Sequence, residues 1–197
     1  MTSQERIKGR KLLNFWYKEA TAEEIETGKN WYNEAREYSK ILSNEFKLPR
    51  LMCSGVISAL SPNNRWERNK IDAHAVLSAI RDNISSFDIK VCTYNSNKRK
   101  AFAIGRGDVK ILEKSPKTFS FANNISGLNN DKVTIDKWHL RAIQTSSKSY
   151  KNCKTNITPL QYRNIEKDCQ KVAKKHDISP STLQAIVWVT IRNRWTS

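Results

Sequence analysis

Glycine and proline are scarce in this chain, which has six glycines and five prolines among its 197 residues. The sequence contains no internal repeat and no low-complexity segment, and Gly105-Arg106-Gly107 lacks the preceding strand that a phosphate-binding loop requires. In most of the longer segments, apolar residues recur at helical rather than alternating spacing. These features predict an all-α fold, built as one compact multi-helix domain.

Cysteine is also rare and dispersed, with single residues at positions 53, 92, 153 and 169. This spacing contains no Cys-x-x-Cys pair, which excludes the usual zinc clips and iron–sulfur motifs. No group of histidine, cysteine, aspartate and glutamate has metal-ligand spacing either. We therefore predict reduced thiols, no metal and no cofactor.

Long apolar runs are absent, because no stretch approaches the roughly 18 apolar residues of a membrane-spanning helix. Met1 is followed by Thr, Ser, Gln and Glu rather than by the apolar segment of a secretion signal. We expect a monomeric protein with no membrane partner, located in the cytoplasm of whichever cell hosts it.

Acidic residues are few beside basic ones: 19 Asp and Glu stand against 35 Lys and Arg, for a net charge of +16. Such an excess favours a polyanionic partner through counterion release and long-range attraction. DNA, single- or double-stranded, is the partner we expect. The alternative explanation is a proteome with generally basic composition.

Capping signals mark several helix starts. A Thr cap followed by Glu or Gln at the third helical position occurs at residues 21–24 and 158–161, and Ser-Pro pairs occur at 61–62 and 179–180. We expect helices to begin near residues 4, 21, 31, 50, 62, 97, 117, 136, 159 and 180. Two apolar stripes at helical spacing are predicted to be core: Trp31, Ala35, Tyr38, Ile41, Leu42 and Phe46, and Leu183, Ile186, Val187 and Ile191.

The single expected domain divides into four segments. N-terminal helices occupy 1–48, the central core occupies 49–142, and a helix pair occupies 158–197. Between them, residues 143–157 are polar and basic without periodicity, which predicts a loop.

The stretch from Leu51 to Arg141 carries the most specific pattern. An apolar helix ends at Leu60-Ser61 and is followed by a polar turn and by Asn69-Lys70. Further along, Lys117-Thr118 precedes the sequence VTIDKWH of residues 133–139. This order resembles the endonuclease III branch of the helix-hairpin-helix DNA glycosylase superfamily. The chain is also similar to a set of uncharacterised bacteriophage proteins that carry ALSPNNRWERN and a terminal LQAIVWVT-like helix.

The resemblance implies a phage-type DNA N-glycosylase, with or without lyase activity, that excises a damaged or modified base. Asp136 falls at the position of the family's catalytic aspartate, where a carboxylate beside C1′ stabilises the positive charge that develops on the sugar. Lys117 falls at the position of the family's nucleophilic lysine, which forms a Schiff base when it loses its proton. His139, one turn beyond Asp136, is expected to be a hydrogen-bonded core residue or to orient the site. Taken alone, Asp136 is equally well explained as a helix cap.

The resemblance also implies contacts to the DNA. Asn63 lies where related enzymes place an amide that fills the hole left by an extruded base. Either Trp66 or Trp138 is expected to stack on a base, while basic side chains take phosphates. The predicted nucleic-acid-binding set is Asn63, Asn64, Arg65, Trp66, Arg68, Lys114, Lys137 and Trp138.

One departure from the family is clear. The family's glycine-rich hairpin is replaced here by Leu112-Glu113-Lys114-Ser115-Pro116, and the glycines are what let backbone amides approach a phosphate. Two other functions therefore stay open. One is a base-hypermodification enzyme acting on modified thymine in phage DNA, and the other is a non-catalytic basic DNA-binding protein on the same fold.

Overall fold

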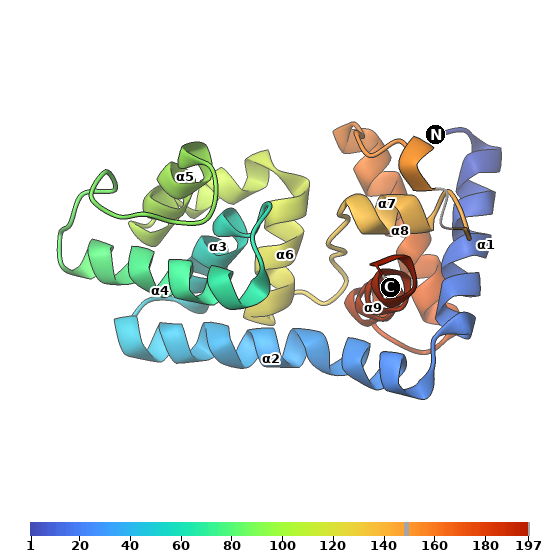
Figure 1. Cartoon of the computed structure of the whole chain (residues 1–197), viewed down its shortest axis with the longest axis horizontal. Helices are drawn as coiled ribbons and strands as arrows, with labels where there is room; N and C mark the ends of the chain where they lie inside the picture. Colours follow the sequence, from blue (N-terminus) through green and yellow to red (C-terminus); the bar gives the residue numbers. More distant parts are fainter. Residues whose placement is uncertain (148–149, 197) are drawn as a thin grey trace. The chain divides into compact units, whose positions relative to one another are not determined.

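The computed structural model describes residues 1–147 and 150–196, and within these ranges every regular element is helical (Figure 1). The predicted all-α fold is confirmed. The elements are α1 (Ser3–Glu19), α2 (Ala22–Phe46), α3 (Arg50–Leu60), α4 (Trp66–Arg81), α5 (Asn95–Gly105), η1 (Val109–Lys114), α6 (Pro116–Ser126), α7 (Lys137–Ala142), η2 (Tyr150–Asn152), α8 (Pro159–Lys175) and α9 (Pro180–Thr196), where η denotes a short 3₁₀ helix.

The chain forms two compact units. Unit 1 consists of Met1–Asn33 and Asn130–Ser197, and unit 2 consists of Glu34–Asn129. The long helix α2 contributes its first part to unit 1 and its second part to unit 2. The unit boundaries do not coincide with the segment boundaries expected from the sequence, and the expectation of one domain stays a prediction.

Unit 1 joins the two ends of the chain around one apolar core. Its buried residues come from α1, the extended segment before α7, and α7 to α9; they include Leu13, Trp16, Val133, Ile135, Leu140, Ile165, Cys169, Leu183, Val187 and Ile191. The extended segment is held by Tyr162 of α8, whose hydroxyl donates to the Val133 carbonyl at 2.6 Å and accepts from the Ile135 amide at 3.1 Å. Glu166 accepts from the Val133 amide at 3.1 Å. These bonds fix the backbone that leads into α7.

One close helix contact in unit 1 depends on glycine. A Cβ atom built on Gly28 of α2 would lie only 2.6 Å from the Ile186 Cα of α9 and 2.7 Å from its backbone nitrogen. Because backbone atoms cannot move aside as a flexible side chain can, only glycine allows α2 and α9 to pack at this distance.

Unit 2 is built around α3, in which every residue from Cys53 to Leu60 is buried. Helices α4, α5 and α6 pack on it, as the continuous apolar run of this segment requires. Its polar side chains are paired: Ser58 Oγ donates to the Thr118 carbonyl of α6 at 2.7 Å. Burial raises the pKa of the Cys53 thiol to about 11, so this cysteine is a packing residue rather than a nucleophile.

Two expected helix starts are wrong. No break occurs near residue 31, because α2 runs on from Ala22 to Phe46 without a Gly-Pro or capping signal to stop it. The start expected at Pro62 lies at Trp66 instead, because Asn63 adopts a left-handed backbone with φ 59°, which interrupts the helical path. No helix within the described ranges is long and apolar enough to cross a membrane.

Candidate nucleic-acid interface

The residues predicted for the site are divided between the two units. Asp136, Lys137, Trp138 and His139 surround the start of α7 in unit 1, whereas the turn at 63–68, Lys114 and Lys117 belong to unit 2. Each group is therefore described within its own unit. The pairing of Lys117 with Asp136 stays a prediction.

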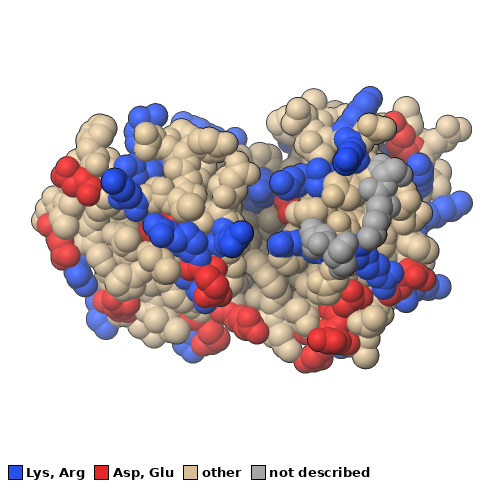
Figure 2. Space-filling view, viewed as in Figure 1, with Lys and Arg blue, Asp and Glu red and all other residues tan. Residues whose placement is uncertain are grey.

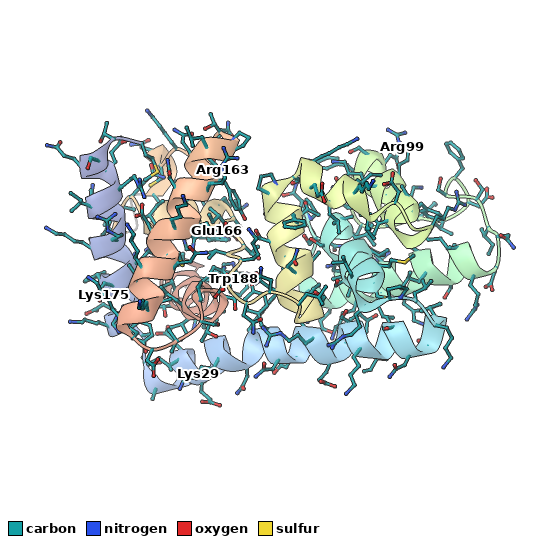
Figure 3. The ribbon with its side chains drawn as sticks, turned by 180° about the vertical axis from the view of Figure 1, so that it is seen from behind. Lys29, Arg99, Arg163, Glu166, Lys175 and Trp188 are labelled. Carbon is teal, nitrogen blue, oxygen red and sulfur yellow. The ribbon has the colours of Figure 1, made fainter. Side chains whose placement is uncertain are left out.

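Asp136 is the N-cap of α7 and is only partly buried. Its Oδ1 accepts hydrogen bonds from the Trp138 amide at 2.9 Å and the His139 amide at 2.8 Å. Its Oδ2 accepts from the Trp188 indole Nε1 of α9 at 3.2 Å, and Trp188 is labelled in Figure 3. The carboxylate is thus held in one orientation by three N–H donors, and the capping role anticipated from the sequence is confirmed.

His139 is fully buried in unit 1, and neither of its ring nitrogens has a hydrogen-bond partner. The expected hydrogen-bonded orienting role is therefore not supported, because only the His139 backbone amide contacts Asp136. Burial lowers the pKa of His139 to about 4, so its side chain is neutral near pH 7. It acts as a core residue with an unsatisfied imidazole.

Trp138 belongs to an aromatic cluster that also holds Arg141. The Arg141 guanidinium carbon lies 4.8 Å from the Trp138 ring centroid and 4.5 Å from that of Tyr150. Tyr150 in turn stacks on Trp195, with centroids 4.8 Å apart and planes at 20°. Trp138 is therefore engaged with a cation and a core ring, which restricts it as a platform for a base. We name Trp138, Arg141, Tyr150 and Trp195 the Arg141 cluster.

The turn at 61–65 in unit 2 is organised by a buried carboxylate that the sequence did not single out. Asp72 of α4 accepts from Asn64 Nδ2 at 2.9 Å, from Arg68 Nε at 2.8 Å and from the Cys92 amide at 2.7 Å. Asn64 and Arg68 are thus structural partners of Asp72, although each was predicted to contact DNA. The spacing of four residues between Arg68 and Asp72 was the available signal.

The other predicted side chains of this turn are more accessible. Asn63 is exposed, with its Nδ2 3.3 Å from the hydroxyl of the exposed Tyr94, and Arg65 is exposed as well. Trp66 is half-buried: its ring packs edge-on against Tyr38 at 6.3 Å. Asn63 and Arg65 therefore remain the members of this turn that face solvent.

The three predicted lysines differ in exposure. Lys114 and Lys137 are exposed and Lys117 is partly buried, and no hydrogen bond or ion pair of any of the three occurs in the described part of the chain. Lys117 lies in the first turn of α6, beside Pro116. The Lys117 amine is therefore available to bind an anion.

Acidic charge is concentrated on one helix. Helix α2 carries six glutamates and three basic residues, although the whole chain has a net charge of +16. Figure 2 shows several acidic side chains along the edge where α2 runs, while lysine and arginine gather elsewhere on the same face. An approaching polyanion is therefore attracted to surfaces other than α2.

No group of three or more His, Cys, Asp or Glu in the described residues is arranged to hold a metal ion. The four cysteines are all free thiols in the structure.

Residues 2–195 match the model of DUF7178, a family of unknown function, and the chain belongs to that family. Neither a curated protein nor a solved structure matches it.

Proposed function

We propose that this protein is a DNA N-glycosylase in which Asp136 supplies the catalytic carboxylate. The observation that carries the proposal is the exposure and hydrogen bonding of the Asp136 side chain. It is partly exposed, it is held in place through both oxygens, and among the described residues no basic side chain is bonded to it. A carboxylate has about four acceptor positions, of which three are occupied here, so negative charge remains to face a substrate.

The proposed reaction breaks the bond between C1′ and the base nitrogen. The bonding electrons leave with the base, which takes up a proton, and positive charge grows on the sugar beside the fixed carboxylate. A water oxygen then bonds to C1′ and releases a proton, giving an abasic site and a free base. In the bifunctional version, the Lys117 amine takes the place of water, and this version requires both residues at one site.

The excess of basic side chains supports the DNA partner, because polyanion binding by released counterions needs no specific pocket. We propose that the exposed Asn63, Arg65, Lys114 and Lys137 contribute to this binding. The same proposal includes a monomer that acts in the cytoplasm.

The test is abasic-site formation on labelled oligonucleotides that carry a panel of damaged or modified bases, read as strand cleavage after alkali. We expect Asp136→Asn to reduce the rate by about two orders of magnitude or more. Asparagine still caps a helix, so α7 should stay folded. Asp108→Asn, at an exposed residue whose side chain caps nothing, is the matched control and should react like the wild type. Equal rates for all three proteins would exclude Asp136 as the catalyst.

A second candidate is a DNA-binding protein without catalysis, and the capping geometry of Asp136 favours it. Bonds to two backbone amides and one indole are a complete structural explanation for a carboxylate at position 136. This candidate predicts salt-dependent binding that Asp136→Asn leaves intact, and no abasic sites on any member of the panel.

A further inference from the structure

Arg141, which the sequence analysis did not select, is held on a rigid aromatic base. Its guanidinium lies against Trp138 and Tyr150. Tyr150 stacks on Trp195, and Trp195 meets Trp16 edge-on at 5.4 Å inside the core of unit 1. Trp16 is itself fixed by a bond from its Nε1 to the Ala142 carbonyl at 3.2 Å. The two rings that contact the guanidinium are therefore themselves held by the core.

The charge of Arg141 is not compensated within the described part of the chain. No carboxylate lies within ion-pair distance of it, and its Nε is buried without an acceptor. Three other arginines of unit 1 are paired: Arg6 and Arg10 both bond to Asp168, and Arg194 lies 3.5 Å from Glu24. A partly exposed guanidinium that lies against two rings and pairs with none of the described carboxylates retains N–H donors for an anion.

Lys8 brings a second positive charge to this part of unit 1, because α1, which carries Lys8, packs against α7. Burial raises the pKa of the Cys153 thiol, and the positive charges of Arg141 and Lys8 oppose that rise. Lys8 on α1 and Arg141 on α7 therefore act on the same small region of unit 1. No hydrogen bond or ion pair of Lys8 occurs among the described residues.

We propose that Arg141 binds a backbone phosphate of a nucleic-acid strand, with Trp138 and Tyr150 holding the guanidinium in place and Lys8 adding positive charge. This inference rests on the proposed function, since it names a contact of the same DNA. Phosphate is the favoured ligand because a planar guanidinium matches two of its oxygens and because the chain as a whole attracts polyanions. Arg141 lies five residues after Asp136, so both belong to the surroundings of α7.

The experiment measures the affinity of the full chain for short fluorescein-labelled single- and double-stranded oligonucleotides by anisotropy at several salt concentrations. Arg141→Gln should weaken binding about five- to tenfold and lower the slope of log K against log salt by about one. Arg141→Lys keeps the charge but not the planar group, so we expect a smaller loss in affinity and an unchanged slope. Arg163→Gln is the matched control, because Arg163 of α8 (Figure 3) is exposed and unpaired in the described structure. It should change affinity less than twofold.

Thermal unfolding of each variant shows whether the cluster still folds, and Arg141→Lys provides a folded comparison if Arg141→Gln does not. Equal losses for Arg141→Gln and Arg163→Gln would overturn the inference. The inference would also be overturned if polyglutamate displaced the oligonucleotide and its own binding were weakened as much by Arg141→Gln, because the ligand would then be an acidic peptide. A wild-type chain that binds neither oligonucleotide overturns both proposals. If abasic sites form and require Asp136, but Arg141→Gln leaves the salt slope of binding unchanged, this inference alone is contradicted. If Arg141→Gln weakens binding and lowers the slope, but no abasic sites form, the glycosylase proposal alone is contradicted.

Discussion

Each unit holds a cation on two aromatic rings, and the two clusters differ in one respect. In unit 2, Lys70 lies 5.9 Å from the ring centroids of both Tyr38 and Trp66, and its Nζ is 2.6 Å from a Glu67 oxygen. In unit 1, Arg141 lies on its two rings, and none of the described carboxylates is within ion-pair distance of it. Aromatic faces attract either cation, but only Glu67 neutralises one. Lys70 is thus neutralised by a neighbour, whereas Arg141 keeps its charge among the described residues.

The units also differ in what their buried aspartates tie together. Asp72 joins a turn, a helix side chain and a loop amide within unit 2. Asp168 receives two arginines from α1 and so fastens α8 to the N-terminal helix of unit 1. Substituting each aspartate in turn tests whether the two units are stabilised separately.

The largest expected effect is the loss of either buried aspartate. Asp72→Ala leaves the Cys92 amide and Asn64 Nδ2 without their acceptor, and Asp168→Ala leaves Arg6 and Arg10 without theirs. We expect each change to lower the free energy of unfolding by about 3 kcal/mol. Hydrogen exchange should rise in residues 61–65 for Asp72→Ala and in α1 for Asp168→Ala. The exposed Asp82→Ala, which removes only a surface pair with Arg81, is the control and should leave both regions unchanged.

Acidification is expected to weaken unit 1 more than unit 2, because His139 is buried without a partner while His74 of unit 2 is exposed and bonded to Glu45. Burial lowers the pKa of His139 from 6.5 to about 4. Between these values the unfolded chain binds a proton at His139 that the folded chain does not. The contribution of His139 to stability is therefore full above pH 6.5 and is lost as the pH falls toward 4. The total loss should be on the order of 3 kcal/mol.

His139→Leu provides the measurement that isolates this effect. Leucine fills a similar volume, and no hydrogen bond of the ring is lost because neither nitrogen has one. Denaturant unfolding at a series of pH values should show a shallower pH dependence for His139→Leu than for the wild type. A slope that stays the same in His139→Leu would mean that another group titrates.

The two units also differ in what surrounds a closely packed glycine. At Gly28 in unit 1 a methyl group meets the backbone of Ile186, whereas at Gly105 in unit 2 it meets the Ile80 side chain at 2.4 Å. A side chain can change rotamer, so Gly28→Ala should cost about 2 to 3 kcal/mol and Gly105→Ala about 1 kcal/mol. Thermal unfolding of the two variants measures the difference. A Gly105→Ala protein that is the less stable of the two would show that unit 2 packs as rigidly as unit 1.

Helical spacing was sufficient to predict the fold class and much of the core. Leu183, Ile186, Val187 and Ile191 are all buried, as their stripe predicts. The N-terminal stripe is correct only in part, because Ala35 and Leu42 are buried whereas Ile41 is 56% exposed. Periodicity identifies a face of a helix, but how much of that face is covered depends on neighbours that are distant in the sequence.

The candidate site was harder to predict because its determinants are long-range. Asp136 was recognisable as a cap from its position before an amphipathic segment, but its bond from Trp188 joins residues 52 positions apart. The role of Asp72 as an acceptor for Cys92 likewise has no local signal. Arg141 follows Trp138 at a spacing that places both on one helix face, yet its second ring, Tyr150, comes from a segment that was expected to be a loop.

The smallest expected effect tests the comparison of the two cation clusters directly. Glu67→Gln removes the charge that pairs with Lys70 and leaves the rings of Tyr38 and Trp66 in place. If an uncompensated cation on aromatic rings is what attracts a phosphate, this change should strengthen oligonucleotide binding by about twofold in the anisotropy assay. Glu37→Gln is the control, because it frees Lys40, an exposed lysine 3.7 Å away. Both variants gain the same net charge. An equal rise in affinity for both would mean that total charge governs binding and that the aromatic setting of the cation contributes nothing.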